Sequence, residues 1–237
     1  TIVMGTSNLV IPKQDDINLP VDKDGLFPVR RIYCVGRNYV SHIREMQEAD
    51  ERDPPFFFQK PRDSLVCHPA ALPYPPMTND YQYEVELVIA LGKNHVPQTI
   101  ESALDLIYGY GVGLDMTRRD RQKDARAAML PWEIGKSFDH SAPCGDLVPA
   151  SRCGHFMQGA ITLSVNGVEK QRGDIAQMIW NVPEIILQLS KQVRLRAGDL
   201  IMTGTPAGVG PLNINDHIVA QVEGLPPLSV TILPGEV

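Results

Sequence analysis

Two glutamates stand two positions apart inside the apolar run Tyr83–Leu91, which reads YEVELVIAL. Side chains alternate across a strand, so Glu84 and Glu86 share one face of it, and both faces are otherwise largely apolar. A strand of this kind is usually covered on both sides, where carboxylates are costly without a cation or several hydrogen bonds. Strand spacing does not place Lys93 or Arg62 between the two glutamates. A bound metal ion would explain them; the alternative is an edge strand with solvated glutamates.

A third carboxylate, Asp115, follows the predicted strand 108–114, whose sequence YGYGVGL has glycine at every second position. Glycine in a strand permits close backbone approach or leaves room for a ligand. If Asp115 lies beside Glu84 and Glu86, the three carboxylates form an oxygen-rich site. Hard oxygen ligands favour Mg²⁺ or Mn²⁺ over Zn²⁺.

An acid–base pair could lie on the helix predicted at 39–48, which Asn38 could cap. His42 and Glu45 are three residues apart there, so they share one helical face and can reach each other. An ordinary surface histidine and glutamate would show the same spacing.

Cationic and amide side chains could face whatever the carboxylates bind. Lys60 ends the run 56–61, whose three phenylalanines predict a strand buried on both faces, and its amine reaches either water or an anion. Arg119 and Gln122 are i,i+3 neighbours near the start of the polar helix predicted at 116–129, which is mostly solvated. Lys136 follows the turn at Gly135 and by itself would be assigned to the surface.

The segment 203–210, TGTPAGVG, is a glycine-rich turn after a predicted strand. It lacks the GK[ST] ending of a phosphate-binding P-loop and no evident helix follows it, so nucleotide binding is poorly supported. Its backbone N–H groups are better suited to a carboxylate.

The elements that must position these residues are mainly strands. A hairpin turn is expected at Asn166–Gly167, and the four prolines of 69–76 predict extended coil. Strands are predicted at 31–35, 56–61, 83–91, 108–114, 142–148, 160–165, 168–171, 200–202, 218–222 and 227–232. Helices are predicted at 39–48, 99–108, 116–129, 174–180 and 183–191.

Length and composition of the 237 residues fit a single domain, expected at 27–237, preceded by an N-terminal arm at 1–26 with one short strand. The net charge of −6 and the absence of a basic block argue against nucleic acid and anionic membranes as partners. Four scattered cysteines without a CxxC pair fit reduced thiols that pack in the interior. No apolar run reaches 18 residues and no signal pattern is present, so a soluble cytoplasmic protein is expected.

From about Phe27 onward the chain resembles the fumarylacetoacetate hydrolase superfamily. The resemblance rests on many motifs in order, and FPVRRIYCVGRNY and WNVPEII make it most similar to the short single-domain acylpyruvases and bacterial fumarylpyruvate hydrolases. The motifs are CVGRNY (34–39), HIREM (42–46), FQKP (58–61), YEVELVIALGK (83–93), GYGVGLDMTRRDRQ (109–122), PWEIGKSFD (131–139), QMIW (177–180) and GDLIMTGTPAGVGPL (198–212).

The resemblance implies a β-rich α+β fold, a mixed β-roll with short flanking helices, and a homodimer. It also implies one Mg²⁺ or Mn²⁺ ion per chain, held by Glu84, Glu86 and Asp115. It gives the catalytic dyad as His42 and Glu45 on a lid. The positions that contact substrate or stabilise its charge match Lys60, Arg119, Gln122, Lys136, Gly204 and Thr205.

The chemistry of such a site predicts carbon–carbon bond hydrolysis. Three carboxylates leave about three positions open on an octahedral ion, enough for the carboxylate and 2-oxo oxygen of a 2-oxo acid. His42, polarised by Glu45, would activate water against the distal carbonyl of a 2,4-dioxo acid, with fumarylpyruvate of aromatic catabolism as the best candidate. The same site could decarboxylate oxaloacetate or isomerise 2-hydroxyhepta-2,4-diene-1,7-dioate. A non-catalytic Ca²⁺-binding domain would leave His42, Lys136 and the 203–210 turn without a role.

Overall fold

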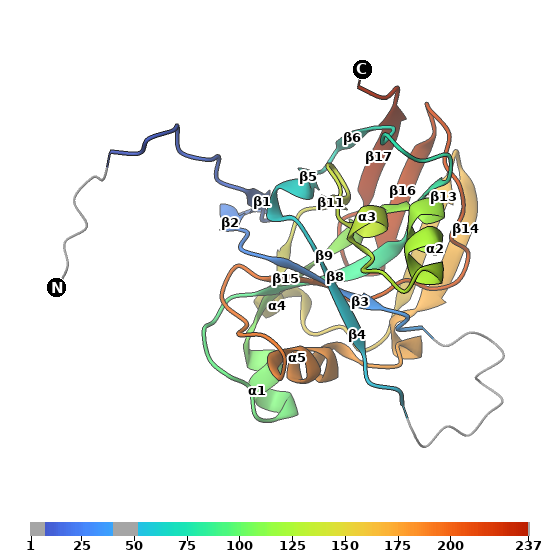
Figure 1. The fold of residues 1–237 in the computed structure, drawn as a ribbon. Coiled ribbons are helices and arrows are strands. Elements are labelled where there is room, and N and C mark those ends of the chain that lie inside the picture. The colour runs from blue at the N-terminus through green and yellow to red at the C-terminus, as the bar shows by residue number, and fades with distance from the viewer. Residues whose placement is uncertain (1–7, 40–51, 237) are drawn as a thin grey trace.

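The computed structural model describes residues 8–39 and 52–236. Two sheets and a few short helices form a β-rich α+β fold (Figure 1). The larger sheet has the strand order β4-β3-β15-β8-β9-β11-β5, with β12 also paired to β9, and the smaller sheet has the order β14-β13-β16-β17-β6. The larger sheet consists of β3 (Ile32–Gly36), β4 (Phe56–Lys60), β5 (Leu65–Cys67), β8 (Val85–Leu91), β9 (Ile107–Leu114), β11 (Ala142–Cys144), β12 (Val148–Pro149) and β15 (Leu200–Met202).

The smaller sheet packs its apolar face against the larger one, and side chains from both belong to one core. Its strands are β6 (Ala70–Pro73), β13 (Ala160–Val165), β14 (Val168–Asp174), β16 (His217–Val222) and β17 (Leu228–Leu233). Asn166 and Gly167 form the hairpin turn between β13 and β14, with both residues at positive φ, as an Asn-Gly turn requires. The predicted hairpin is confirmed.

The strand β8 is the centre of the larger sheet, and every residue in it is buried. The expectation that Tyr83–Leu91 is covered on both faces is therefore confirmed, although the strand itself begins at Val85. Its neighbour β9 approaches closely because it carries glycine at alternate positions. A Cβ at Gly113 would lie 2.6 Å from the Val88 side chain and 2.8 Å from Met202. Glycine at this position therefore leaves the space that the Val88 and Met202 side chains fill beside the carboxylates.

Short helices flank the sheets at two places (Figure 1). One pair, α1 (Ile100–Asp105) and α5 (Val182–Ser190), packs together, with caps at Thr99 and Asn181. The other pair, α2 (Arg119–Ala127) and α3 (Glu133–Lys136), packs together, with α3 against β4. The remaining elements are α4 (Ala150–Cys153), the 3₁₀ turns η1 (Arg62–Ser64) and η2 (Ile175–Gln177), and the two-stranded pairs β1 (Asn18–Pro20) with β2 (Leu26–Pro28) and β7 (Tyr81–Gln82) with β10 (Thr117–Arg118).

Several predictions differ from the structure. The run 56–61 forms β4 as predicted, but it is an edge strand and Phe56 is 48% exposed, so it is not buried on both faces. The proline-rich segment 69–76 contains β6, which pairs in parallel with β17. The helix expected at 174–180 is the single turn η2, capped by Asp174. The helix expected at 39–48 lies almost entirely outside the described residues.

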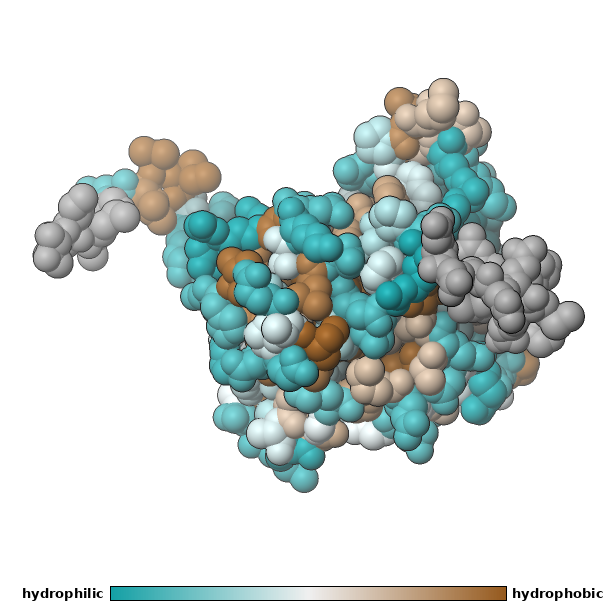
Figure 2. Space-filling view, turned by 90° about the horizontal axis from the view of Figure 1, so that it is seen from below, coloured by the Kyte–Doolittle hydropathy of each residue, from teal (hydrophilic) through white to brown (hydrophobic). Residues whose placement is uncertain are grey.

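The N-terminal segment leaves the body of the molecule before the β1–β2 hairpin. Its consecutive apolar residues Leu9, Val10 and Ile11 are 61%, 100% and 65% exposed, and Figure 2 shows them as a brown group standing apart from the main surface. The four cysteines are free. Within the described ranges, no helix combines the length and hydrophobicity needed to cross a bilayer.

Candidate metal and substrate site

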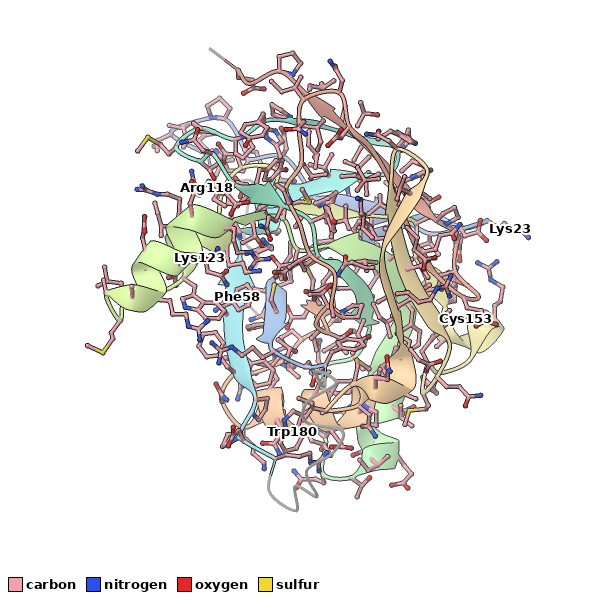
Figure 3. The ribbon with its side chains drawn as sticks, turned by 90° about the vertical axis from the view of Figure 1, so that its right-hand side faces the viewer. Lys23, Phe58, Arg118, Lys123, Cys153 and Trp180 are labelled. Atoms are coloured by element: carbon pink, nitrogen blue, oxygen red, sulfur yellow. The ribbon has the colours of Figure 1, made fainter. Side chains whose placement is uncertain are left out.

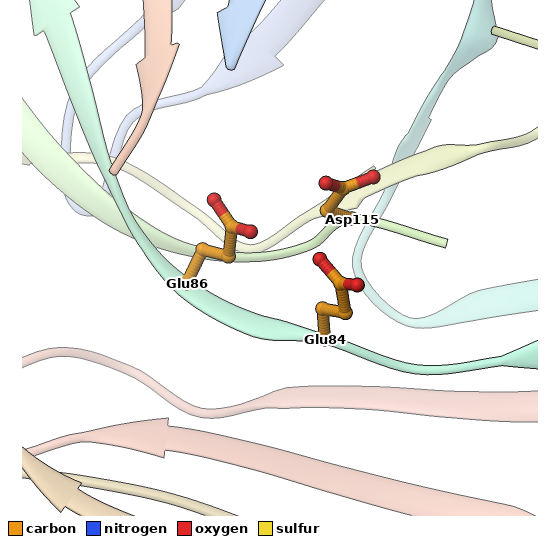
Figure 4. A group of neighbouring side chains, drawn as sticks. All are labelled: Glu84, Glu86 and Asp115. Atoms are coloured by element: carbon orange, nitrogen blue, oxygen red, sulfur yellow. The ribbon is translucent and has the colours of Figure 1, made fainter. Parts of the chain in front are cut away.

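Three buried carboxylates meet where β8 begins beside the end of β9. Glu84 lies just before β8, Glu86 lies within it, and Asp115 directly follows β9. Their oxygens include a set in which all lie within 4.8 Å of one another, and Figure 4 shows the three carboxylates turned toward a common point. The antiparallel register, in which Glu86 faces Gly113 and Val85 faces Leu114, produces this meeting. The juxtaposition predicted from the sequence is present.

Cations from distant parts of the sequence surround this triad. Lys136 Nζ lies 2.9 Å from Asp115 Oδ2 and 3.0 Å from Glu84 Oε2. Arg119 Nη2 lies 2.6 Å from Glu84 Oε1, and Lys60 Nζ lies 2.7 Å from Asp115 Oδ1. Lys136 and Lys60 are each only 2% exposed. Lys60 therefore faces an anion rather than water. Lys136 is buried, although its sequence context alone predicted a surface position. The cations missing from the neighbourhood of 83–91 in the sequence are supplied by tertiary structure.

The electrostatic balance differs among the three carboxylates. Burial raises the pKa of Asp115, but Lys136 and Lys60 outweigh it and hold that pKa below its usual value. Burial, followed by repulsion from Asp115 and Glu84, raises the pKa of Glu86 well above its usual value. Glu86 accepts one backbone hydrogen bond, 2.8 Å from the N–H of Gly204, and forms no ion pair with the described residues. It is the member of the triad with the greatest need for a cation.

The donor set fits a hard divalent ion. All three side chains offer carboxylate oxygens, and Asp115 Oδ1 is buried without a well-aligned hydrogen bond from the described part of the chain, although Lys60 lies close to it. Glu86, unlike Asp115, has no cationic partner among the described residues. A small ion such as Mg²⁺ or Mn²⁺ would bind both Asp115 Oδ1 and the Glu86 carboxylate, and it would offset the mutual repulsion of the triad.

A cavity of about 510 Å³ opens onto the triad. Among the predicted substrate contacts, Arg119, Gln122, Lys136 and Thr205 line it, whereas Lys60 lies behind Asp115 and Gly204 bonds to Glu86. The 203–210 turn thus donates to a carboxylate, but to the protein's own. His42 and Glu45 lie outside the residues that the structure describes.

Other positioning residues were not identified from the sequence. Gln171 of β14 is fully buried and donates through Nε2 to Thr205 Oγ1 (2.8 Å), so the smaller sheet holds the 203–210 turn. Asn38 donates to the carbonyls of Thr203 (2.8 Å) and Trp180 (2.9 Å), and its oxygen accepts from the Trp180 N–H. Asn38 was predicted as a helix cap, and only its polarity next to a strand end indicated a buried role.

Aromatic side chains form one wall of the cavity. Phe58 and Trp132 both line it, with ring centroids 6.0 Å apart, and Lys136 Nζ lies 5.4 Å from the Phe58 ring. Figure 3 shows Phe58 on β4 beside the helix α2, which carries Lys123, with Trp180 toward the start of β4. The aromatic wall therefore adjoins the buried lysine.

Comparison with known proteins places this geometry in context. The family model described as fumarylacetoacetate (FAA) hydrolase C-terminal matches residues 31–233. A fumarylpyruvate hydrolase from a Ralstonia species is 46% identical over 181 residues, which cover 76% of this chain and 94% of the relative. An oxaloacetate tautomerase of Escherichia coli is 39% identical over 199 residues, covering 84% and 90% of the two chains.

Solved structures agree with these sequence matches. The fumarylpyruvate hydrolase of Pseudomonas aeruginosa, solved with Mn²⁺ and pyruvate, is 47% identical, with a TM-score of 0.89 over 96% of this chain and all of that chain. A fumarylpyruvate hydrolase candidate from Burkholderia cenocepacia is 44% identical, with a TM-score of 0.90 over 98% and 97% of the two chains.

Proposed function

The chain belongs to the fumarylacetoacetate hydrolase family, and we propose that it hydrolyses the bond between carbons 3 and 4 of a 2,4-dioxo acid, fumarylpyruvate first among them. The observation that carries this proposal is the buried triad of Glu84, Glu86 and Asp115 at the base of a cavity that also contains Lys136 and Arg119. The relatives that are 46% and 47% identical are named fumarylpyruvate hydrolases. The products would be fumarate and pyruvate, as in the catabolism of aromatic compounds.

The triad is proposed to hold one Mg²⁺ or Mn²⁺ ion. Such an ion would bind the carboxylate and 2-oxo oxygen of the substrate and would favour the enolate charge that develops there. Mn²⁺ is the ion named for the Pseudomonas structure, and all-oxygen ligands also suit Mg²⁺.

The chain's own residues supply the remaining steps. We assign His42, polarised by Glu45, as the base that removes a proton from a water molecule. The hydroxide that remains forms a bond to the acyl carbon, carbon 4. The bond between carbons 3 and 4 then breaks, and the enol end takes a proton at carbon 3 to become pyruvate. Lys136, next to the triad, is assigned to neutralise the developing oxyanion or to hold the substrate carboxylate. Lys60, Arg119, Gln122, Gly204 and Thr205 are assigned to support substrate and its charge.

The His42→Ala variant tests the base. Its kcat should fall by about 10²- to 10⁴-fold, because general-base catalysis contributes on that scale, while metal affinity stays unchanged. Turnover at the wild-type rate would remove His42 from the mechanism. His155 on the same chain hydrogen-bonds to Tyr110 away from the triad, and His155→Ala is the matched control.

Oxaloacetate is the second candidate substrate, because relatives 38–39% identical are named oxaloacetate tautomerases. The test is an assay of EDTA-stripped protein with fumarylpyruvate, acetylpyruvate and oxaloacetate, each with and without Mg²⁺ or Mn²⁺. Metal-dependent loss of the dioxo acid with equal formation of pyruvate supports the hydrolase. Turnover of oxaloacetate alone would transfer the assignment to that substrate.

A homodimer acting in the cytoplasm completes the proposal. The exposed apolar residues Leu9, Val10 and Ile11 would gain from burial against a second subunit, and four free cysteines suit a reducing compartment. Light scattering should give twice the mass of 26.2 kDa. A monomer at micromolar concentration would contradict the dimer.

A further inference from the structure

Two exposed arginines, Arg37 and Arg126, line the cavity and do not pair with the carboxylate triad, which is the inner site. Among the described residues, four cationic side chains line the cavity, and two of them, Arg119 and Lys136, pair with the triad. The side chains of Arg37 and Arg126 form no hydrogen bond, ion pair or aromatic contact with the described residues. The triad supplies the only acidic side chains on the described lining. An arginine on a cavity wall without an acidic partner is suited to bind an anion.

The register of α2 relates Arg126 to the inner site. Arg119, Gln122 and Arg126 are spaced i, i+3 and i+7, so they share one helical face, and all three line the cavity. Arg119 binds Glu84 at one end of this row. Arg126 lies two turns further along, about 10 Å at 1.5 Å per residue. Long side chains on a helix lean toward its N-terminus, which favours a position of the Arg126 guanidinium over the cavity.

The place of α2 is fixed by a backbone contact. A Cβ at Gly135 of α3 would lie 2.7 Å from the backbone nitrogen of Gln122, so the two helices touch without an intervening side chain. Lys136 follows Gly135 directly, and Gln122 also accepts from Arg119 Nη1 at 2.6 Å. The helix that presents Arg126 is therefore held against the one that presents Lys136.

Much of the cavity lining outside the triad and its cations is apolar. Phe58 and Trp132 form one wall, and Pro206 and Ala207 from the glycine-rich turn also line the cavity. A flat hydrocarbon linker suits such walls, because aromatic faces contact planar groups over a large area. A ligand with a chelating end, a short planar middle and a terminal carboxylate would match the three zones.

We propose that Arg126 binds the distal carboxylate of the substrate, so that the enzyme prefers 2,4-dioxo acids whose acyl group itself ends in a carboxylate. This inference rests on the proposed function. Fumarylpyruvate has this form, since its second carboxylate stands three carbons beyond the carbonyl that water attacks. Acetylpyruvate has the same reacting atoms and no second carboxylate.

The test compares these two substrates with the Mg²⁺-loaded wild type and the variant Arg126→Gln. For fumarylpyruvate, kcat/KM should fall by about 10- to 100-fold, as expected for a charge-assisted hydrogen bond, mostly through KM. For acetylpyruvate it should change less than about twofold, and Arg126→Lys should recover part of the loss. Lys123→Gln is the matched control, because Lys123 is exposed on the same helix but does not line the cavity.

Equal losses on both substrates, or no loss on either, would overturn the role of Arg126. A selective loss in Arg37→Gln with none in Arg126→Gln would also overturn it. Wild-type hydrolysis of acetylpyruvate as efficient as that of fumarylpyruvate would refute the preference while leaving the hydrolase intact. If the wild type cleaves neither dioxo acid, the proposed function itself fails.

Discussion

Buried carboxylates lie at both ends of β8, and the two ends differ in how completely the chain hydrogen-bonds them. Glu86 and Asp115 lie at one end, and Asp199 lies at the other, where its carbonyl accepts from the N–H of Leu91. Leu91 lies five positions after Glu86, roughly 17 Å along the strand. Asp199 accepts from Arg30 Nη1 through both oxygens (2.9 and 3.2 Å) and from the Arg196 N–H (2.8 Å). Asp199 is thus fully hydrogen-bonded by the chain, whereas Glu86 has one backbone donor.

This difference separates a structural carboxylate from a functional one. Arg30 and Asp199 join the residues before β3 to those before β15, and Asp199 does not line the cavity that opens onto the triad. At the triad, the carboxylates line a cavity together with their partners Arg119 and Lys136. The satisfied end should govern stability, and the unsatisfied end should govern binding and catalysis.

The largest expected effect is that of Glu86→Gln. Loss of a charged ligand should weaken Mg²⁺ binding and lower kcat/KM by at least about 100-fold, since even indirect partners of a metal contribute 10- to 100-fold. The metal-free variant should be at least as stable as the metal-free wild type, because the pKa of Glu86 shows that its charge is disfavoured by burial and by its neighbours. Calorimetric titration and thermal unfolding measure the two quantities.

Glu169→Gln is the matched control for this variant. Glu169 is exposed on β14 and pairs only with Arg172 among the described residues, so both readouts should stay at wild-type values. Unchanged Mg²⁺ affinity in Glu86→Gln would remove Glu86 from the ligand set. A large loss of metal-free stability would place it with Asp199 as a structural group.

Asp199→Ala should show the opposite pattern. It leaves the Arg30 guanidinium and the Arg196 N–H without their acceptor, which should lower the free energy of unfolding by about 2–3 kcal/mol. The kcat/KM of the folded protein should change little. Asp105→Ala removes an exposed partner of Lys93 and should leave the thermal midpoint almost unchanged. Loss of activity at full stability in Asp199→Ala would contradict the division between the two ends.

Much of this arrangement could be predicted from local patterns. The alternation in 83–91 and 108–114 predicted the strands beside which Glu84, Glu86 and Asp115 lie, and the caps at Thr99 and Asp174 act as expected. The three carboxylates could be proposed as metal ligands because the two glutamates belong to one apolar run and Asp115 directly follows another strand. These are short-range signals, and tertiary structure did not override them.

The remaining features depend on long-range contacts that no local pattern encodes. Lys60 was assigned either to water or to an anion, and only the packing of β4 beside β3 buries its amine against Asp115. The strand β6 pairs with β17 across more than 150 residues, so its prolines alone suggested coil. The hydrogen bond from Gln171 of the smaller sheet to Thr205 could not be predicted either, because it also joins residues far apart in the sequence.

A smaller effect is expected from Gly135→Ala, which probes the backbone contact at the site end. The added methyl group would meet the Gln122 backbone at 2.7 Å, so stability should fall by about 1–2 kcal/mol and kcat/KM should fall with it as α2 shifts. Gly25→Ala is the control, because nothing lies within 4 Å of a Cβ there. Unlike Asp199→Ala, this variant should therefore lower both quantities. A stable, fully active Gly135→Ala would show that α2 and α3 can separate without consequence.

The smallest expected effect is a difference in pH dependence between Asp199 and its asparagine variant. Burial raises the pKa of Asp199 despite the Arg196 N–H and Arg30, so the folded state holds this proton more tightly than the unfolded state. The wild type should therefore lose stability relative to Asp199→Asn as pH rises from about 3.8 through the folded pKa, and the difference should then level off. Urea unfolding of the two metal-free proteins between pH 3 and 7 measures it. A difference that grows in favour of the wild type as pH rises would mean that Arg30 outweighs burial, as the lysines do at Asp115.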